Sequence, residues 1–295
     1  MLYLRVLTLL SLLFLLTFCS NNERLEQYEH PRLLFSSGFE NDVEIQTGSN
    51  VNYPGFDFIT GEDLTTGYTW PVSILRSSSY NGLHYISDNN RQAVRSEIQI
   101  VRGHNGNMTK ALFQEQNEAF QDDTACAYEI FDILDGTKDL YIRYWIKLDT
   151  AGMSQPDSWR QIFSYKTQGY DIAEGYRLSA YVKTDAQGIP YWYMQADNAG
   201  SVLWEIENDN LAVPVGEWFK MELFWHWSDG ADGRTLWKIN GNPIVDYMGA
   251  TTYYSQPLSK INLWQISGNV NPKKQWIDDI QIWSSLYDIS RYDRN

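Results

Sequence analysis

Residues 217–247, EWFKMELFWHWSDGADGRTLWKINGNPIVDY, decide the fold. Apolar side chains fill every second position at the start of this stretch, namely Phe219, Met221, Leu223, Trp225 and Trp227. Because alternate side chains of a β-strand point to the same face, the pattern predicts a strand with one dry face. Turn sequences then separate further alternating segments, at Asp229-Gly230, Asp232-Gly233 and Asn240-Gly241. The region therefore predicts two consecutive β-hairpins.

The composition extends this prediction to the whole chain. Of 295 residues, 12 are Trp, 20 are Tyr, 12 are Phe and 20 are Gly, and no long helical periodicity is found. Aromatic-rich segments bounded by turn residues are typical of strands, so an all-β fold is predicted. The expected strands are 33–39, 94–101, 111–116, 127–133, 140–148, 160–166, 176–183, 190–195, 260–266 and 275–283. A chain of this length suits one large sandwich.

The amino-terminal segment predicts export from the cell. Residues 1–19 hold one arginine, an apolar run and Cys19, which is the pattern of a secretory signal peptide. The ending Leu-Thr-Phe-Cys resembles a bacterial lipobox, so we expect Cys19 to be lipidated and residues 20–32 to form a polar tether. The expected location is secreted, as an outer-membrane or cell-surface lipoprotein of a bacterium. Ordinary secretion or an uncleaved anchor are the alternatives.

Charge and cysteine content narrow the possible partners. The formal net charge of −14 argues against nucleic acid, whose phosphates would be repelled. We expect membrane contact only through the lipid anchor, and a monomer. Because Cys126 is the only other cysteine, no disulfide framework is predicted, and the core must supply the stability.

Several motifs carry a family resemblance over roughly residues 33–286. They are Gly38-Phe39-Glu40, Arg95-Ser96-Glu97, Gly216-Glu217-Trp218 and the hairpin sequence Leu236-Trp237-x-x-Asn240-Gly241. Together they resemble the polysaccharide lyases grouped with heparin lyase I and glucuronan lyase. The resemblance implies a concanavalin A-like β-jelly-roll sandwich of two curved antiparallel sheets, as a single domain over 33–290. It also implies cleavage of an acidic, uronate-containing glycan by β-elimination.

The polar positions of the middle strands predict a sugar-binding floor. In 160–166, 176–183 and 190–195, polar and aromatic side chains alternate with apolar ones, so neighbouring strands can present them on one face. Aromatic rings suit pyranose faces, and charged or amide groups suit hydroxyls and carboxylates. The predicted substrate-binding residues are Glu97, Gln99, Lys166, Arg177, Lys183, Tyr191 and Gln195.

β-Elimination requires a group that neutralises the uronate carboxylate and a group that moves the proton. We expect Arg95 and Gln99, with Gln161, to bind the carboxylate. Tyr181 or Tyr193 is the expected acid/base, helped by Lys183.

The chain also resembles jelly-roll alginate lyases, through Arg95 and Glu97, Gln161-Ile162, Tyr181 and Lys183, and Tyr193 and Gln195. In that family a histidine stands where this chain has Phe163. We expect His226 to supply the missing imidazole if the reaction needs one.

The sequence lacks the motifs of other classes of sugar-active enzyme. No Glu-x-Asp-x-x-Glu strand of a retaining glycosidase and no Gly-x-Ser-x-Gly turn is found. The four histidines, His30, His84, His104 and His226, show no zinc-ligand spacing. No cofactor is therefore expected for catalysis.

A structural calcium ion is expected from the family resemblance. Glu40 in the opening motif and Asp278 or Asp279 in the last strand match the hard oxygen ligands of such a site. The alternative is that Glu40 is a turn residue and the two aspartates only mark strand polarity.

The other assignments have structural alternatives as well. Arg95 and Glu97 could form a simple ion pair, and His226 could be a packed residue between two tryptophans. The alternative to the enzyme as a whole is a non-catalytic carbohydrate-binding jelly roll.

Overall fold

The computed structural model describes residues 31–47, 57–70, 83–86, 94–116, 122–131, 138–256, 258–270 and 272–286. These residues form antiparallel β-sheets with one short 3-10 helix, Tyr170–Ile172 (η2). The predicted fold class, an all-β jelly-roll sandwich, is confirmed. The predicted signal peptide (1–19) with Cys19, most of the tether (20–32) and the domain end at 290 lie outside the described residues.

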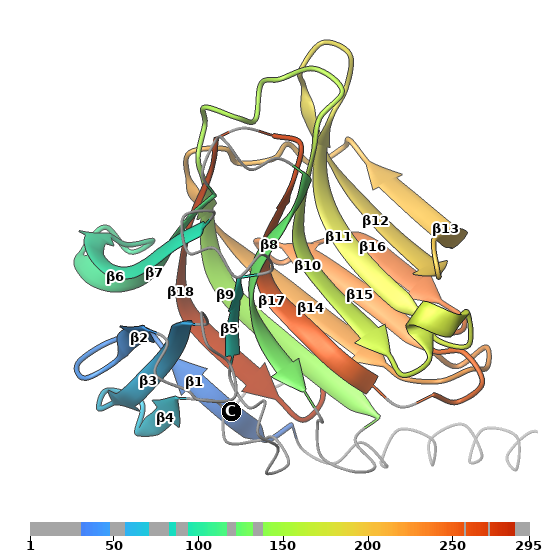
Figure 1. Ribbon diagram of the computed structural model, residues 1–295, viewed down its shortest axis with the longest axis horizontal. Helices are drawn as coiled ribbons and strands as arrows, with labels where there is room; N and C mark the ends of the chain where they lie inside the picture. Colours follow the sequence, from blue (N-terminus) through green and yellow to red (C-terminus); the bar gives the residue numbers. More distant parts are fainter. Residues whose placement is uncertain are drawn as a thin grey trace, which may run out of the picture.

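The strands divide between two sheets (Figure 1). The eight-stranded sheet runs β16-β15-β14-β9-β18-β7-β6, with β1 beside β18. Its strands are β1 (Leu33–Ser37), β6 (Val94–Arg102), β7 (Met108–Gln116), β9 (Asp139–Leu148), β14 (Trp218–His226), β15 (Arg234–Ile239), β16 (Asn242–Met248) and β18 (Lys273–Trp283).

The ten-stranded sheet runs β13-β12-β11-β10-β17-β8-β5-β3-β2, with β4 beside β3. Its strands are β2 (Glu44–Thr47), β3 (Asp57–Asp63), β4 (Tyr68–Trp70), β5 (Leu83–Ile86), β8 (Asp122–Phe131), β10 (Trp159–Thr167), β11 (Arg177–Thr184), β12 (Pro190–Asn198), β13 (Ser201–Asn208) and β17 (Leu258–Gly268). No helix within the described residues has the length and apolar character needed to cross a membrane.

Strand β14 has the dry face that its alternation predicts. Phe219, Met221, Leu223 and Trp225 have no exposed surface, and Trp227 is half-buried just beyond the strand. Burying one such side chain contributes about 1.5–3 kcal/mol. Strand β14 pairs with β15, and β15 pairs with β16, so both predicted hairpins are confirmed.

Aromatic side chains join the two sheets. Tyr165 of β10 stacks on Trp225 of β14, with ring centroids 5.6 Å apart and an interplanar angle of 9°. Phe163 of β10 meets the same indole edge-on at 5.4 Å. Because all three side chains are fully buried, they form one apolar layer between the sheets. This layer fixes which side of β10 faces outward.

Three features of the fold were not predicted from the sequence, and the first is strand β13, which is not among the expected strands. The short strands β2 to β5 were missed, because segments of three to seven residues carry too few alternations to stand out. The segments 260–266 and 275–283, both expected as strands, lie in β17 and β18, and their alternation did not show that these strands belong to different sheets.

A buried carboxylate ties the first strand to the β3–β4 hairpin. Asp63 Oδ2 accepts hydrogen bonds from Ser37 Oγ at 2.9 Å, Gly38 N at 2.8 Å and Glu40 N at 3.3 Å. The Ser37 hydroxyl in turn accepts a hydrogen bond from the Trp70 indole at 2.9 Å. Although burial opposes the charged form, the hydrogen bonds that the Asp63 carboxylate accepts from Thr65, Ser37, Gly38 and Glu40 hold its pKa below the ordinary value.

We expect Asp63→Asn to lower the free energy of unfolding by about 1–3 kcal/mol near neutral pH, because a buried acceptor is lost. Since the folded-state pKa is depressed, the stabilisation is complete above the unfolded pKa and disappears as pH falls through the folded value. Urea unfolding from neutral pH to below pH ~4 measures both effects. The exposed variant Asp42→Asn is the control, and a pH-independent difference for Asp63→Asn would contradict the explanation.

Candidate functional site

The register of β10 to β13 builds one continuous polar face on the ten-stranded sheet. Its cross-strand rows are Trp159-Lys183-Tyr191, Gln161-Tyr181-Tyr193-Glu207, Ser164-Ser179-Gln195-Glu205 and Lys166-Arg177-Asp197. The alternate residues of β11, Leu178, Ala180 and Val182, are fully buried in the core. These rows therefore lie on the side of the sheet that faces away from the core, which we call the polar face.

Most of the predicted sugar-binding and catalytic residues meet on the polar face. They are Gln161, Lys166, Arg177, Tyr181, Lys183, Tyr191, Tyr193 and Gln195. The prediction that three separate segments form one floor is confirmed, because β10, β11 and β12 are neighbours in the sheet. The structure does not test the roles of the individual residues.

Aromatic rings form the centre of the polar face. Tyr181 lies edge-on between Tyr193 and Trp159, with centroid distances of 5.8 Å and 5.9 Å. The Lys183 ammonium nitrogen lies 3.0 Å from the Tyr193 ring centroid and 6.0 Å from that of Tyr181. Such contacts are cation–π interactions. Burial raises the pKa of Tyr181 and lowers the pKa of Lys183.

Tyr193 is held by an acceptor on the adjacent strand β13 and one on its own strand β12. Its hydroxyl donates a hydrogen bond to Glu205, and it lies 3.2 Å from Gln195 Oε1. Only 4% of the residue is exposed. Burial and the Glu205 carboxylate raise the pKa of Tyr193, so its hydroxyl stays protonated at neutral pH.

A second cluster surrounds Asp197 at one end of the polar face. Arg177 donates to Asp197 Oδ2 through Nη2 at 2.7 Å and through Nε at 3.0 Å. The Tyr170 hydroxyl donates to Oδ1 at 2.7 Å, and Gln195 Nε2 donates to Oδ2 at 3.1 Å. The Tyr170 ring also carries Lys166, whose ammonium is 4.6 Å from the centroid. Asp197 is fully buried, so this end of the face has a fixed shape.

The nitrogen and the oxygen of the Gln161 side-chain amide both form hydrogen bonds with neighbouring strands. Its amide nitrogen donates to Ser179 Oγ at 2.7 Å, and its oxygen accepts from Ser267 Oγ at 3.3 Å. With 6% exposure it is part of the support of the polar face. Its predicted contact with a uronate carboxylate stays a prediction.

Arg95, Glu97 and Gln99 do not belong to the polar face, so the prediction that they join Gln161 was wrong. They lie on β6, at the far end of the eight-stranded sheet (Figure 1). Arg95 Nη2 is 2.8 Å from Glu97 Oε1, and Gln99 Oε1 accepts from the Trp276 indole at 3.0 Å. Sequence alternation shows which residues share a strand face but not which sheet the strand enters.

His226 is also placed elsewhere, on β14 of the eight-stranded sheet. Its Nδ1 lies 2.8 Å from Asp139 Oδ1, and its Nε2 lies 3.9 Å from Asp232 Oδ2. The expectation that it supplies an imidazole to the tyrosines was therefore wrong.

The residue in place of the family histidine does not reach the polar face either. A register shift between Gln161 and Phe163 in β10 turns Phe163 into the core. Ser164 takes the next outward position and donates to Gln265 Oε1 at 2.7 Å.

Several residues of the polar face were not predicted as site residues: Trp159, Tyr170, Asp197, Glu205 and Glu207. The alternation of Glu205 and Glu207 with Trp204 and Ile206 was a usable signal for the two glutamates. Tyr170 begins the short 3-10 helix η2, where the alternation of a strand gives no information.

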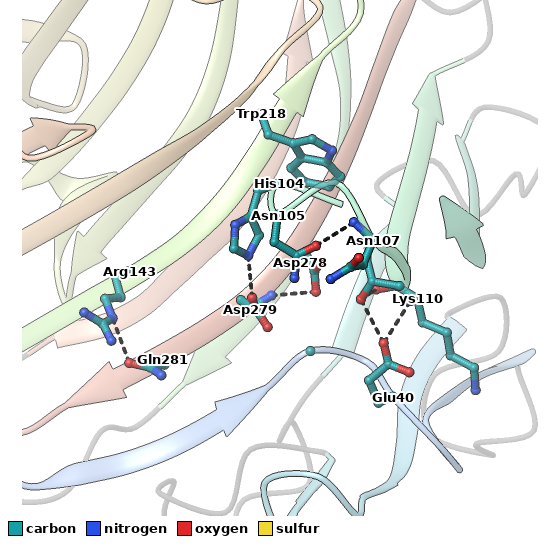
Figure 2. Close-up of polar contacts among 12 residues, drawn as sticks. Glu40, His104, Asn105, Asn107, Lys110, Arg143, Trp218, Asp278, Asp279 and Gln281 are labelled. Atoms are coloured by element: carbon teal, nitrogen blue, oxygen red, sulfur yellow. Dashed lines mark hydrogen bonds and ion pairs between the residues drawn. The ribbon is translucent and has the colours of Figure 1, made fainter. Parts of the chain in front are cut away.

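Of the predicted calcium ligands, Asp278 and Asp279 lie on β18 of the eight-stranded sheet, and Glu40 lies nearby in the turn after β1 (Figure 2). A β-carbon built on Gly38 would lie 3.0 Å from Asp279 Oδ1 and 3.5 Å from Asp278 Oδ1. Burial and the neighbouring Asp279 carboxylate raise the pKa of Asp278 to about 8. A cation would relieve this crowding of carboxylates.

Protein donors already occupy two of these carboxylates, as Figure 2 shows. Glu40 Oε1 accepts from Thr109 Oγ1 at 2.8 Å and Lys110 N at 3.0 Å, and Asp279 Oδ2 lies 2.7 Å from His104 Nε2. Among the described residues no group of three His, Cys, Asp or Glu side chains could hold a metal ion. The cluster as it stands does not fit a calcium ion, and calcium binding stays a prediction that melting temperatures with calcium and with a chelator would test.

No family model matches the chain, and no curated protein matches it by sequence. Solved structures with a similar strand arrangement include a mutant of alginate lyase Aly36B in complex with alginate tetrasaccharide, at 14% identity and a TM-score of 0.46 over 64% of this chain and 82% of that one. Endo-β-1,4-glucuronan lyase from the fungus Trichoderma reesei matches at 13% identity and 0.47, over 67% and 89%. The marine PL-14 alginate lyase from Aplysia kurodai matches at 9% identity and 0.46, over 85% and 98%.

These likenesses are to polysaccharide lyases, but identities and TM-scores this low carry no argument about activity. The finer resemblance to heparin lyase I is not tested by them. The functional proposal therefore rests on the residues of the polar face.

We expect Asp197→Ala to lower the free energy of unfolding by about 2–3 kcal/mol, because it leaves the half-buried Arg177 guanidinium without its carboxylate. Asp197→Asn should cost less, since it keeps an acceptor for the Tyr170 hydroxyl. Urea unfolding measures both, with the exposed Asp209→Asn as the control. Equal losses in all three variants would show that the Arg177–Asp197 pair has no special role.

Proposed function

We propose that the protein is a polysaccharide lyase and that the polar face of the ten-stranded sheet is its active surface. The observation that carries the proposal is the cluster of Tyr181, Tyr193 and Lys183, in which two tyrosine rings and an ammonium group lie together on the side of β11 and β12 that faces away from the core. Aromatic rings, cations and amides on one face are the groups that bind a uronate-containing glycan. The export expected from residues 1–19 agrees with an extracellular polymer as substrate.

The reaction we propose is β-elimination at a uronate. A base removes the proton on the ring carbon next to the carboxyl group, a carbon–carbon double bond forms, and the glycosidic carbon–oxygen bond breaks. The leaving oxygen takes a proton. A cation that binds the carboxylate makes the first proton more acidic.

Tyr181 is the residue we assign to the proton transfers. It is half-buried, lies centrally between Trp159 and Tyr193, and has Lys183 and Arg177 for neighbours. As a phenolate it can accept the ring proton, and as a phenol it can return that proton to the leaving oxygen. Tyr193 is the poorer choice, because only 4% of the residue is exposed and its hydroxyl is hydrogen-bonded to Glu205.

A non-catalytic carbohydrate-binding protein is the second candidate. It is favoured by the many hydrogen bonds that the polar side chains form with one another, as in the Asp197 cluster and around Gln161. A binding surface needs such rigid groups but has no need of a proton-transfer residue. The two candidates differ in whether unsaturated product appears.

We expect the protein to release unsaturated uronate products from at least one of alginate, glucuronan and heparin-type chains, followed by their ultraviolet absorbance. Tyr181→Phe should lower kcat/KM by about 100-fold or more, as expected for loss of a proton-transfer group. Because burial raises the pKa of Tyr181, the rate should rise with pH as phenolate forms.

Tyr254→Phe, at an exposed tyrosine away from the polar face, is the matched control and should keep wild-type turnover. Absence of unsaturated product with every polymer, together with retained glycan binding, would favour the binding protein. Full turnover by Tyr181→Phe would remove Tyr181 from the reaction.

A further inference from the structure

Lys183 differs from Arg177, a second cation of the polar face, in the contacts that its charged group makes. Arg177 is committed to Asp197 through two hydrogen bonds. Lys183 makes aromatic contacts, and among the described residues no hydrogen bond or ion pair engages its ammonium group. An ammonium group has three donors, so Lys183 can still bind an anionic ligand.

The Tyr193 ring holds this ammonium group in place. The separation of 3.0 Å from nitrogen to ring centroid puts the charge directly over the ring, well within the range of a cation–π contact. A free lysine side chain samples many rotamers, and a fixed ring beneath it restricts that freedom before a ligand arrives.

Glu205 in turn fixes the ring. The Tyr193 hydroxyl donates to the Glu205 carboxylate, which stands on the adjacent strand β13. Tyr193 is 4% exposed and its hydroxyl is hydrogen-bonded to Glu205, so the residue offers little surface to a sugar. The Tyr193 ring therefore affects ligand binding by positioning Lys183, and Glu205 affects it by positioning Tyr193.

We propose that Tyr193 and Glu205 are positioning residues that hold Lys183 above the polar face as the group that binds the carboxylate of an acidic sugar. This assignment rests on the proposed function, because it takes the ligand to be a uronate chain. Lys183 lies 6.0 Å from the Tyr181 ring centroid, so one sugar residue can meet both groups.

The change in uronate affinity when Glu205 is removed distinguishes a positioning role from a simple effect of its charge. A carboxylate on the face repels an anionic sugar, so its removal should tighten uronate binding if Glu205 acts by charge alone. A positioning role predicts weaker binding instead. Glu207 is the matched control, because it stands on the same strand, also acts on Lys183 through its charge, and makes no hydrogen bond to Tyr193.

The experiment measures the affinity of the full chain for oligomers of mannuronate and glucuronate, with a neutral cello-oligosaccharide as reference ligand. We expect Glu205→Ala and Tyr193→Leu to weaken uronate binding by about tenfold, the size of one partly desolvated cation–π contact. Glu207→Ala should bind as well as wild type or better. Tyr193→Phe keeps the ring and should lose less than Tyr193→Leu. Affinity for the neutral oligomer should not change.

A nuclear magnetic resonance signature tests the geometry without activity. The Lys183 side-chain protons above the Tyr193 ring should carry a ring-current shift that Tyr193→Phe keeps and Tyr193→Leu abolishes. Tyr193→Phe and Glu205→Ala keep the test decisive if Tyr193→Leu fails to fold.

Three results would overturn the assignment: tighter binding by Glu205→Ala, wild-type affinity in Tyr193→Leu, or no uronate affinity in the wild type. Loss of turnover but not of binding in Tyr193→Phe would make Tyr193 itself catalytic and also overturn it. Uronate binding that depends on Tyr193 and Glu205, without any unsaturated product, would support the positioning role while rejecting the lyase.

Discussion

The structure depends on one irregularity in β10. Between Gln161 and Phe163 the pairing with β11 shifts by one residue, so Phe163 and Tyr165 point inward while Gln161 and Ser164 point outward. The inward rings meet Trp225 of the other sheet and join the two layers. If the shift were absent, regular alternation would turn Phe163 and Tyr165 outward and Ser164 inward.

The two faces of the ten-stranded sheet therefore have separate tasks. The inner face supplies stability through fully buried side chains such as Leu178 and Val182. The outer face uses the intervening positions for Tyr181, Lys183 and their neighbours. Because the backbone of these strands is fixed by the core, the polar groups on top are held in place before any ligand binds, which lowers the entropic cost of recognition.

Alternation within a strand was readable from the sequence, and pairing between strands was not. The dry face of β14, its two hairpins and the grouping of Tyr181 with Tyr193 follow from period-two patterns and local turns. Arg95 shows the limit, because its strand alternates as clearly as β11 and yet pairs into the other sheet. Phe163 shows a second limit, since a bulge inverts the expected face and leaves little trace in the residue pattern.

Strand β13 is the last strand of its sheet, and no other strand among the described residues pairs with its outer side. Such an edge can recruit an extended segment from another molecule and begin aggregation. Glu205 and Glu207 are exposed along this edge, and the side chains of Val202 and Leu203 lie beside them. A second copy of the chain that paired with this edge would place its own Glu205 and Glu207 carboxylates next to these two, and the like charges would repel. The glutamate that hydrogen-bonds Tyr193 thus also places a negative charge at the edge of the sheet, which opposes the pairing of two copies there.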